Sequence, residues 1–517
     1  MSNMPAKRRI PPLSFDSPAD RSLRICAWLG GVFCLLLFGV RFASTLSFSE
    51  ALQFQTSGDE TASLFAVWKW TTGEDVYTDR HNIPFAAALF NWLFYASYGV
   101  FVAAVQGLLG HTDAWQPTLG RLFTAVGAAA IGTATYAAAC KAGGNRVLSL
   151  AYAVLVAIGP LVGFWALTVR PDIWATALEI GAAAVFLHLY PRRTWAAVGC
   201  AAGLAYLAWS FKQSSVFAAG AIGFLLLVRR EWWLLAAFTA LLTAAWLLTF
   251  VLAGPAYRTA VMFSDYPLFF TAERALRNVV NFAIKSGPTV LPILMTSILL
   301  LRRPALIRAL YRNDSTVLGF GGLLSGLVIA LPLSGQTGAS ENYYFSMSAF
   351  LALLTVAILA TVNKPGPEHD RAWHPAVAIS ASVGWIAVAL GVTSVLAGVV
   401  GATSLRKDHV AWNEFRICTD KLPRPLYVAD RYLSLPWMTP GTTPFVRAYV
   451  YEIERAAGVA FEADGIGGLI RSGRFASIAV PGQQTLQELD GASFDAYVVD
   501  HHACPTMTVY RRRTPAE

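Results

Sequence analysis

Two short polar segments in this sequence have residue types that suit acid–base chemistry or cation binding at a membrane surface. Asp59 and Glu60 are adjacent and open an expected helix, and Arg170 and Asp172 flank a proline at the end of an apolar run. Carboxylates in such places can take a proton from a hydroxyl group or hold a divalent cation. Both can equally cap helices, with Arg170 held at the interface. Spacing alone leaves the two interpretations open.

The composition indicates that these segments lie in a membrane protein. The chain has 517 residues, of which 55% are hydrophobic and 14% are charged, and its mean hydropathy is +0.49. Soluble domains contain about 25% charged residues, so an ordinary soluble fold is excluded. The net charge of +9 does not indicate a nucleic-acid partner, because the basic residues form short clusters between apolar runs. Such clusters are typical of cytoplasmic loops.

The apolar runs predict a polytopic α-helical protein with about eleven transmembrane helices, since a spanning helix needs about 20 residues. The expected spans are 24–43, 119–139, 147–168, 173–190, 195–211, 213–228, 232–253, 287–301, 316–333, 343–361 and 375–399.

Charge sets the expected topology. With the basic N-terminus in the cytoplasm and residues 85–109 not crossing the membrane, every basic loop falls inside, as the positive-inside rule requires. We therefore expect residues 85–109 to lie at the outer interface or to pack back into the bundle. These loops contain Lys141 and Arg146, Arg192 and Arg193, Arg229 and Arg230, Arg302 to Arg312, and Lys364 and Arg371. The same topology puts Asp59 and Asp172 on the outer face. We therefore expect the inner membrane of a bacterium, crossed many times, with an extracytoplasmic C-terminus.

The chain divides into a membrane module, residues 1–401, and a polar C-terminal α/β domain, residues 402–517. The module contains an external loop with interfacial helices at 46–118. Strands are expected near 425–430, 475–480 and 495–500, and a helix near 445–457. Cys418 and Cys504 lie in the tail and could pair in an oxidising compartment, but no spacing rule decides whether they do.

The order of these features resembles that of the GT-C glycosyltransferases, close to protein O-mannosyltransferases and the lipid A aminoarabinose transferase. That family has an Asp-Glu pair in the first external loop, a Gly…Tyr…Pro pattern, interfacial helices, a second Asp and often a periplasmic domain. The counterparts here are Asp59-Glu60, the residues Gly73, Tyr77 and Pro84, the 85–109 segment, Asp172 and the tail. The resemblance spans most of the chain as architecture, and as sequence it rests on residues 57–84 and 168–172.

The resemblance implies a catalytic role for Asp59 as general base, with Glu60 in support. A sugar would move from a polyprenyl-phosphate donor to a hydroxyl group of a lipid, glycan or protein acceptor, with inversion at the anomeric carbon. Membrane lipid would be the other partner, and nucleic acid would not be one. Asp172 would be a second carboxylate or a ligand of a divalent cation, Mg²⁺ or Mn²⁺, although the family is mixed in its use of metal.

Donor contacts are expected from three basic residues. Some relatives place a lysine near the proline to meet the donor phosphate, and here Arg80 and His81 precede Pro84 instead. Lys212, at an outer turn, could also meet the phosphate, or its ammonium group could extend to the interface while its stem stays buried.

The remaining expected cavity-lining residues are Tyr77, Arg170, Glu341, Asn342 and Tyr344. The last three begin a span at the outer face, where they could instead form part of an aromatic belt and cap a helix.

Two other classes of function remain. A transporter or lipid-linked sugar flippase would also have many spans and a few charges at membrane depth, although inverted repeats and broken helices are not evident. A scaffold protein would need only its C-terminal tail, which would bind its partners. The sequence has no Walker motif, no dinucleotide-binding fingerprint and no zinc-finger spacing, so a nucleotide-driven enzyme is disfavoured. The sugar and the acceptor stay undetermined.

Overall fold

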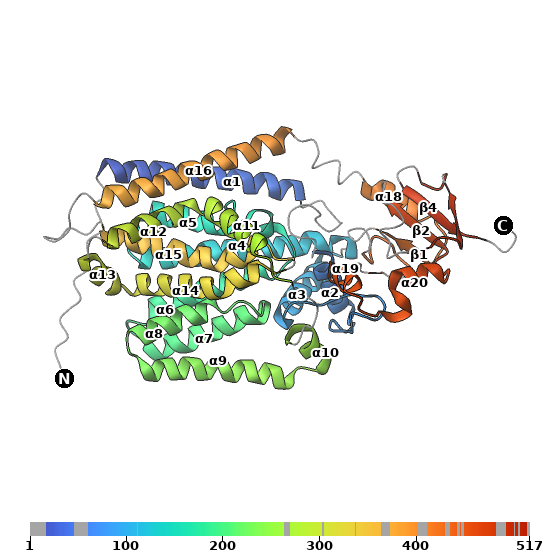
Figure 1. Cartoon of the computed structure of the whole chain (residues 1–517), viewed down its shortest axis with the longest axis horizontal. Helices are drawn as coiled ribbons and strands as arrows, with labels where there is room; N and C mark the ends of the chain where they lie inside the picture. The colour runs from blue at the N-terminus through green and yellow to red at the C-terminus, as the bar shows by residue number, and fades with distance from the viewer. Residues whose placement is uncertain are drawn as a thin grey trace.

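The computed structural model shows a long bundle of helices with a small mixed domain at one end (Figure 1). It describes residues 17–45, 60–110, 112–262, 269–301, 304–336, 338–362, 373–401, 411–429, 435–441, 445, 449–481, 493–500, 502–504 and 507–513. Asp59, Arg302, Arg303, Lys364, Arg371 and the expected domain boundary at 401/402 therefore lie wholly or partly outside the described residues.

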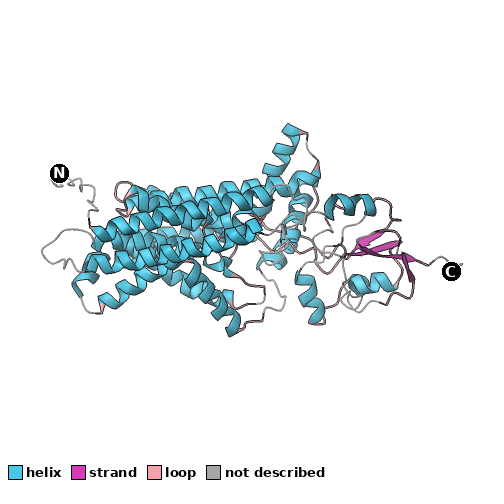
Figure 2. Ribbon diagram, turned by 90° about the horizontal axis from the view of Figure 1, so that it is seen from above, coloured by secondary structure: helices cyan, strands magenta, loops and turns pink. Residues whose placement is uncertain are grey.

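Each expected span contains a helix. These helices are α1 (Pro18–Thr45), α4 (Gln116–Lys141), α5 (Arg146–Ile158), α6 (Asp172–Leu189), α7 (Thr194–Phe211), α8 (Phe217–Val228), α9 (Trp232–Leu252), α12 (Gly287–Leu300), α14 (Asp314–Ser334), α15 (Phe345–Val362) and α16 (Trp373–Gly401). In Figure 2 they run side by side along the length of the bundle.

The expected count of eleven spans is not confirmed. Nine helices of the described part are long and apolar enough to cross a membrane, and α5, α8 and α12 are too short to be among them, with 13, 12 and 14 residues. The run 147–168 is interrupted because Gly159 precedes a proline, which disfavours the helical region; Gly159 has ψ −177° and ends α5.

The other helical segments lie between the long helices. They are α2 (Glu60–Thr72), α3 (Trp92–Leu109), the 3₁₀ turns η1 (Asp113–Trp115), η2 (Gly163–Leu167) and η4 (Glu341–Tyr344), α10 (Pro255–Tyr257), the π-helical turn η3 (Arg258–Met262), α11 (Ala272–Lys285) and α13 (Pro304–Tyr311).

The parts of the basic loops that the structure describes meet at one end of the bundle. Arg229 pairs with Asp314 at 2.7 Å, and Asn313 at the start of α14 donates to Thr361 near the end of α15 at 3.3 Å. At the same end of the bundle, Asp20 in the first turn of α1 lies 2.9 Å from His374 at the start of α16. The C-terminal domain lies at the opposite end of the bundle (Figure 1). The described parts of these loops therefore share one face, and which side of the membrane that face occupies stays a prediction.

Helix α3 covers the part of the 85–109 segment that we expected at the interface. Asn91 caps it and donates to the carbonyl of Trp209 at the end of α7, at 2.8 Å. Tyr98 contacts Thr124, in the first third of α4, at 2.7 Å. These contacts place α3 against the ends of its neighbours. Its length and apolarity would also allow it to cross a membrane, so the interfacial position stays a prediction.

The C-terminal domain is a four-stranded sheet with helices, as expected. The strands are β1 (Leu426–Val428), β2 (Ser477–Pro481), β3 (Tyr497–Asp500) and β4 (Met507–Arg512), in the order β1-β2-β4-β3. Strands β1 and β2 are parallel, and the other pairs are antiparallel. The domain also contains α18 (Ala411–Thr419), α19 (Tyr449–Ala456), η5 (Glu462–Asp464) and α20 (Gly465–Arg471). Strand β4 was not among our expectations.

Cys418 and Cys504, whose pairing the sequence left open, form a disulfide with 5.7 Å between their Cα atoms. The bond joins the end of α18 to the segment that precedes β4. A disulfide is typical of an extracytoplasmic compartment, as we expect for this domain.

The shared face of the basic loops gives a topology prediction. We expect a cysteine in place of Lys141, which is exposed, to react with a membrane-impermeant maleimide only after cells are opened. The background would carry alanine at the free cysteines Cys26, Cys34, Cys140 and Cys200. The matched control is Thr112→Cys at the other end of α4, which should react in intact cells. Labelling of residue 141 from outside would contradict the topology.

Candidate functional site

A buried ion pair begins the candidate site. Glu60, the first residue of α2, accepts hydrogen bonds from Arg121 Nε at 3.3 Å and Nη2 at 3.0 Å, and both side chains are fully buried. Glu60 also accepts the backbone N–H of Val169 at 3.0 Å. Arg121 Nη1 donates to the carbonyl of Thr45 at 3.1 Å, at the end of α1. One pair of charges therefore joins α1, α2, α4 and the segment before α6.

Residues 168–172, between η2 and α6, are held through their backbone. Thr124 Oγ1 donates to the carbonyl of Thr168 at 3.0 Å, and the Tyr98 hydroxyl donates to the carbonyl of Arg170 at 3.3 Å. The N–H of Val169, between them, is bound by Glu60. Three consecutive residues are thus fixed by α4, α3 and α2. This fixes the direction in which the side chains of Arg170 and Asp172 leave the chain.

Asp172 is the centre of a buried cluster of polar side chains. Its Oδ1 accepts from Lys212 Nζ at 2.5 Å and from Asn342 Nδ2 at 2.8 Å, and its Oδ2 accepts from Arg170 Nε at 3.3 Å. All four residues are buried. Segments distant in sequence therefore meet at one carboxylate, and the cluster contains two cations and one anion.

Aromatic rings enclose the two cations. The Arg170 guanidinium lies 4.5 Å from the ring centre of Trp165 and 5.3 Å from that of Phe90. The Lys212 ammonium lies 4.3 Å from the ring centre of Tyr343. Cation–π contacts gain strength when the groups are removed from water. The side chain of Lys212 is 9% exposed and turned towards Asp172, so it does not extend to the interface as one of our two interpretations expected.

The Asp172 cluster does not suit a divalent cation. The described part of the chain contains no group of three His, Cys, Asp or Glu side chains that could hold a metal ion. Two positive groups already occupy the oxygens of Asp172, and they would repel a further cation. Glu60 is committed in the same way to Arg121.

Arg80 and His81, expected at the donor phosphate, contact the C-terminal domain. Arg80 donates to Glu454 Oε1 on α19 from Nε at 2.9 Å and from Nη2 at 2.6 Å. His81 Nε2 lies 3.5 Å from Glu454 Oε2, and the imidazole packs edge-on against Phe461. The N–H of Ile83 donates to Glu462 at 2.8 Å. The loop that contains Arg80, His81 and Ile83 is therefore the surface on which the domain sits.

Tyr77 contacts the cluster indirectly, through Phe90. Its hydroxyl donates to the carbonyl of Phe90 at 2.9 Å, and its ring meets Tyr257 edge-on at 4.9 Å. Burial raises the pKa of the Tyr77 hydroxyl well above its usual value, so the group stays a neutral donor. Since the ring of Phe90 lies beside Arg170, Tyr77 acts on the cluster through Phe90.

The η4 turn sends its side chains in different directions. Glu341 pairs with Lys285 on α11, and the Tyr344 hydroxyl lies 2.8 Å from Ser334 Oγ. Of the three expected residues of this turn, Asn342 contacts Asp172. Side chains in a 3₁₀ turn advance by about a third of a turn per residue, so neighbours face different partners. Tyr343, which we did not select, is the tyrosine that meets Lys212.

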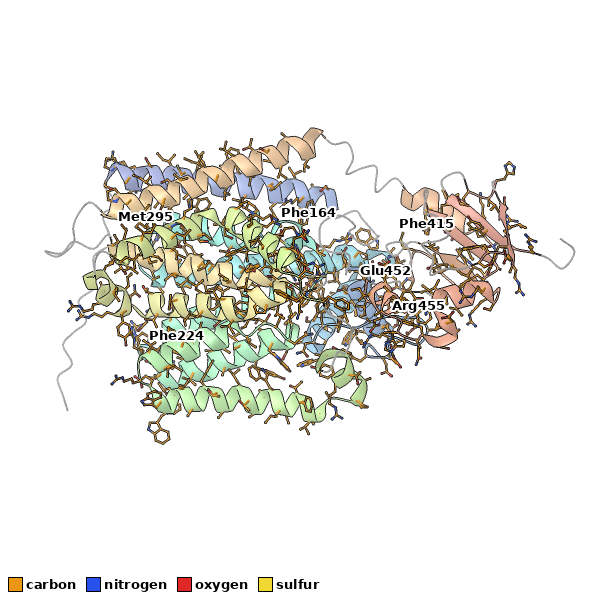
Figure 3. The ribbon with its side chains drawn as sticks, in the orientation of Figure 1. Phe164, Phe224, Met295, Phe415, Glu452 and Arg455 are labelled. Carbon is orange, nitrogen blue, oxygen red and sulfur yellow. A yellow bond between two sulfur atoms is a disulfide. The ribbon has the colours of Figure 1, made fainter. Side chains whose placement is uncertain are left out.

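A cavity of about 330 Å³ lies between the loop that follows α2 and the α10–η3 segment. The residues that line it are Thr78, Asp79, Arg80, His81, Ala87, Ala88, Leu89, Ala256, Thr259 and Ala260. Gln213, next to Lys212, donates to the carbonyl of Leu89 at 3.0 Å and so ties the cavity wall to the turn of the cluster. Figure 3 shows Phe164 at this end of the bundle, and Glu452 and Arg455 on α19 across the junction.

Sequence reasoning missed Arg121, Tyr343 and Glu454. Arg121 had a signal, because it is a charged residue inside the apolar run 119–139, and such residues are often paired or functional. Tyr343 and Glu454 had no local signal, since their roles depend on a turn and on domain docking.

Crystal structures of a bacterial transferase match nearly the whole chain. ArnT from Cupriavidus metallidurans in the apo state gives a TM-score of 0.57 at 12% identity, over 93% of this chain and 97% of ArnT. ArnT bound to undecaprenyl phosphate gives 0.54 at 13% identity, over 94% and 98%. An oligosaccharyltransferase from Archaeoglobus fulgidus gives 0.47 at 11% identity, over 96% and 74%. No protein-family profile and no curated protein sequence matches.

The chain has the GT-C fold. The architecture that the motif order implied is thereby confirmed, and so is the expectation of a multi-pass membrane protein. Within this GT-C fold, the Asp172 cluster lies at the end of the bundle that faces the C-terminal domain. Identities of 12% to 13% extend the likeness to the fold, and the roles of single residues have to be argued from their contacts.

The Asp172 cluster predicts how substitutions of its charged residues change the free energy of unfolding. Asp172→Asn removes the carboxylate that Lys212 and Arg170 share in a buried site, and we expect a loss of about 3–5 kcal/mol in the free energy of unfolding. Adding Lys212→Met should recover part of that loss, because it removes one of the two buried cations. Unfolding by denaturant in detergent would measure both. Asp314→Asn, at a half-exposed ion pair, is the control and should cost less than about 1 kcal/mol. A double variant no more stable than Asp172→Asn would contradict the cluster.

The docking of the C-terminal domain gives a second prediction. We expect Glu454→Gln to loosen the domain, because Arg80 then lies buried without its carboxylate. Limited proteolysis of the full chain should release the C-terminal domain several-fold faster in Glu454→Gln. The control is Glu452→Gln on the same helix, which the Arg80 contact does not involve. Equal cleavage rates for the two variants would contradict the role of the pair.

Proposed function

We propose that this chain is a membrane glycosyltransferase that moves a sugar from a polyprenyl-phosphate donor to an acceptor hydroxyl on the extracytoplasmic face. The observation that carries the proposal is the cationic cluster of Arg170, Lys212 and Asp172 at the bundle end of a GT-C fold. ArnT, which has the same fold over almost all of both chains, binds undecaprenyl phosphate. A lipid-linked donor is therefore the substrate class that best suits this site.

The cluster suits a phosphate leaving group. When the bond between the anomeric carbon and the phosphate oxygen breaks, negative charge develops on the polyprenyl phosphate. Arg170 and Lys212 both contact the Asp172 carboxylate, so two cationic side chains lie together where they could meet that oxygen. Charges fixed in a buried site stabilise a developing charge without having to reorganise. Asp172 is then a positioning residue that holds both cations, with Asn342 aligning its carboxylate.

The general base that we propose is the carboxylate that precedes Glu60 in the sequence. Glu60 is locked between Arg121 and the Val169 N–H, so we assign it a positioning role. Asp59, which lies outside the described residues, precedes it by one position and is our proposed general base. The acceptor oxygen attacks the anomeric carbon, its proton passes to Asp59, and the bond to the phosphate oxygen breaks. Attack opposite the leaving group inverts the configuration.

The cavity lined by Thr78, Asp79 and His81 is tied to the cluster through Gln213, which is next to Lys212 and donates to the carbonyl of Leu89 in the cavity wall. We propose that it receives the sugar or the acceptor, whether lipid, glycan or protein. Donor-phosphate binding by Arg80 would require the phosphate to replace Glu454, which is now its partner at 2.6 Å. No step of this mechanism needs Mg²⁺ or Mn²⁺, and a metal near Asp59 stays a proposal. We further propose the bacterial inner membrane as the location, with a cytoplasmic N-terminus.

The deciding experiment measures release of polyprenyl phosphate from a panel of polyprenyl-phosphate sugars, with membrane extract as the source of acceptor. Loss of a general base should slow Asp59→Asn by about 10²–10⁴-fold. The control is Asp75→Asn, an exposed carboxylate in the same external loop, which should retain wild-type turnover. Turnover by wild type would also identify the sugar.

Two outcomes would count against the proposal. Equal turnover by Asp59→Asn and wild type would remove Asp59 as the base. If folded wild-type protein releases no phosphate from any donor but moves lipid-linked sugar across vesicle membranes, the chain is a flippase instead.

A further inference from the structure

Helix α11 presents an apolar stripe that the protein does not cover. Leu276, Val280 and Ile284 follow at intervals of four residues, which places them on one side of the helix. Their exposed fractions are 65%, 45% and 68%. Exposed apolar residues in a row on one helix face indicate a surface that contacts another apolar phase or partner.

The other faces of α11 are assigned. Ala275, Asn278 and Phe282 are buried against the bundle, where Asn278 donates to the carbonyl of Ser334 at 2.8 Å. Arg277 and Asn281 lie next to the stripe around the helix, on its polar face. The helix thus has a protein face, an apolar face and a polar face, which is the pattern of a helix at a membrane surface.

The direction of α11 decides which phase the stripe meets. The helix bends by 95° at Ser286 into α12, which packs beside α16 along the bundle (Figure 1). Since the bundle helices cross the bilayer, a helix at right angles to them lies parallel to the membrane plane. On α12, Leu294 and Ile298 are also exposed. The helix to which α11 is joined therefore also exposes apolar side chains, on a bundle that lipid surrounds.

We propose that α11 is an in-plane membrane helix whose Leu276, Val280 and Ile284 side chains insert into the lipid of the outer interface. The occupant is the bilayer itself, because α11 lies at right angles to the bundle and is joined to a bundle helix that also exposes apolar side chains. Phe269 and Phe270, exposed just before α11, suit the headgroup level, where aromatic residues collect.

The helix also holds part of the candidate site. The ring of Phe282 stacks on Tyr344 at 4.8 Å, and Lys285 pairs with Glu341. Both partners belong to the η4 turn, whose Asn342 donates to Asp172. An anchor in the lipid therefore fixes the turn that completes the cluster. The catalytic meaning of this link rests on the proposed function, whereas the lipid contact rests on the geometry of α11.

Spin labels on α11 test the lipid contact directly. Single cysteines would replace Leu276, Val280, Ile284 and, as the matched control, Asn281, in a background with alanine at the four free cysteines and the disulfide retained. In phospholipid nanodiscs, collision with oxygen reports the lipid phase and collision with a water-soluble nickel chelate reports the aqueous phase. We expect oxygen collisions to exceed nickel collisions several-fold at residues 276, 280 and 284, and the order to reverse at residue 281.

Three other outcomes would overturn the proposal. Nickel reaching the stripe as freely as it reaches residue 281 would place α11 in water. Protection of the stripe from both reagents would indicate cover by protein, and equal oxygen exposure of residue 281 would place the whole helix in lipid. Gel filtration of each labelled variant confirms its fold. The measurement contains no sugar donor, so a failure of sugar transfer would leave its result unchanged.

Discussion

The ion pair between Glu60 and Arg121 holds together the end of the bundle on which the site depends. Burying two charges is costly, and the cost is offset only when hydrogen bonds satisfy the remaining polar atoms. Here Glu60 accepts a hydrogen bond from the Val169 N–H, and Arg121 donates one to the carbonyl of Thr45. The polar atoms that compensate the charges come from α1 and from the 168–172 segment. Stabilising the pair and assembling these elements are thus the same event.

The site follows from that assembly. Once Val169 is fixed, Arg170 and Asp172 on either side of the proline have set directions, and Tyr98 and Thr124 fix the flanking carbonyls. Asp172 then gathers Lys212 from the end of α7 and Asn342 from η4. Each charged side chain is satisfied by groups from another element. Such a network is rigid, as a site that stabilises developing charge requires.

The membrane divides the molecule into surfaces with different chemistry. Along the bundle, exposed leucines, isoleucines and valines suit lipid, as on α12 and the stripe of α11. At one end the basic loops meet, and at the other lie the cluster, the cavity and the docked domain. The Arg80–Glu454 pair and the seating of α11 both act at this second end. A lipid-linked substrate would meet a polar site there without leaving the bilayer.

The sequence by itself determined the helical membrane architecture, the mixed C-terminal domain and the shared end of the basic loops. It could do so because apolar run length and loop charge are local quantities set by the thickness and polarity of the bilayer. It also singled out Arg170, Asp172, Lys212 and Asn342, the four members of one cluster, because polar residues at the ends of apolar runs are conspicuous. The interruption of α5 at Gly159 shows the limit of run length, since a single Gly-Pro step broke an expected span.

Only the tertiary structure decided which polar residue meets which. That Glu60 is locked by Arg121, that Arg80 faces Glu454 and that Tyr343 rather than Tyr344 meets Lys212 depend on separations of 61, 374 and 131 positions or on the phase of one turn. Pairing of Cys418 with Cys504 likewise required the sheet to bring them to 5.7 Å. Such contacts result from packing helices and docking a domain, and no local pattern encodes them, because each partner satisfies the other only after the chain has folded.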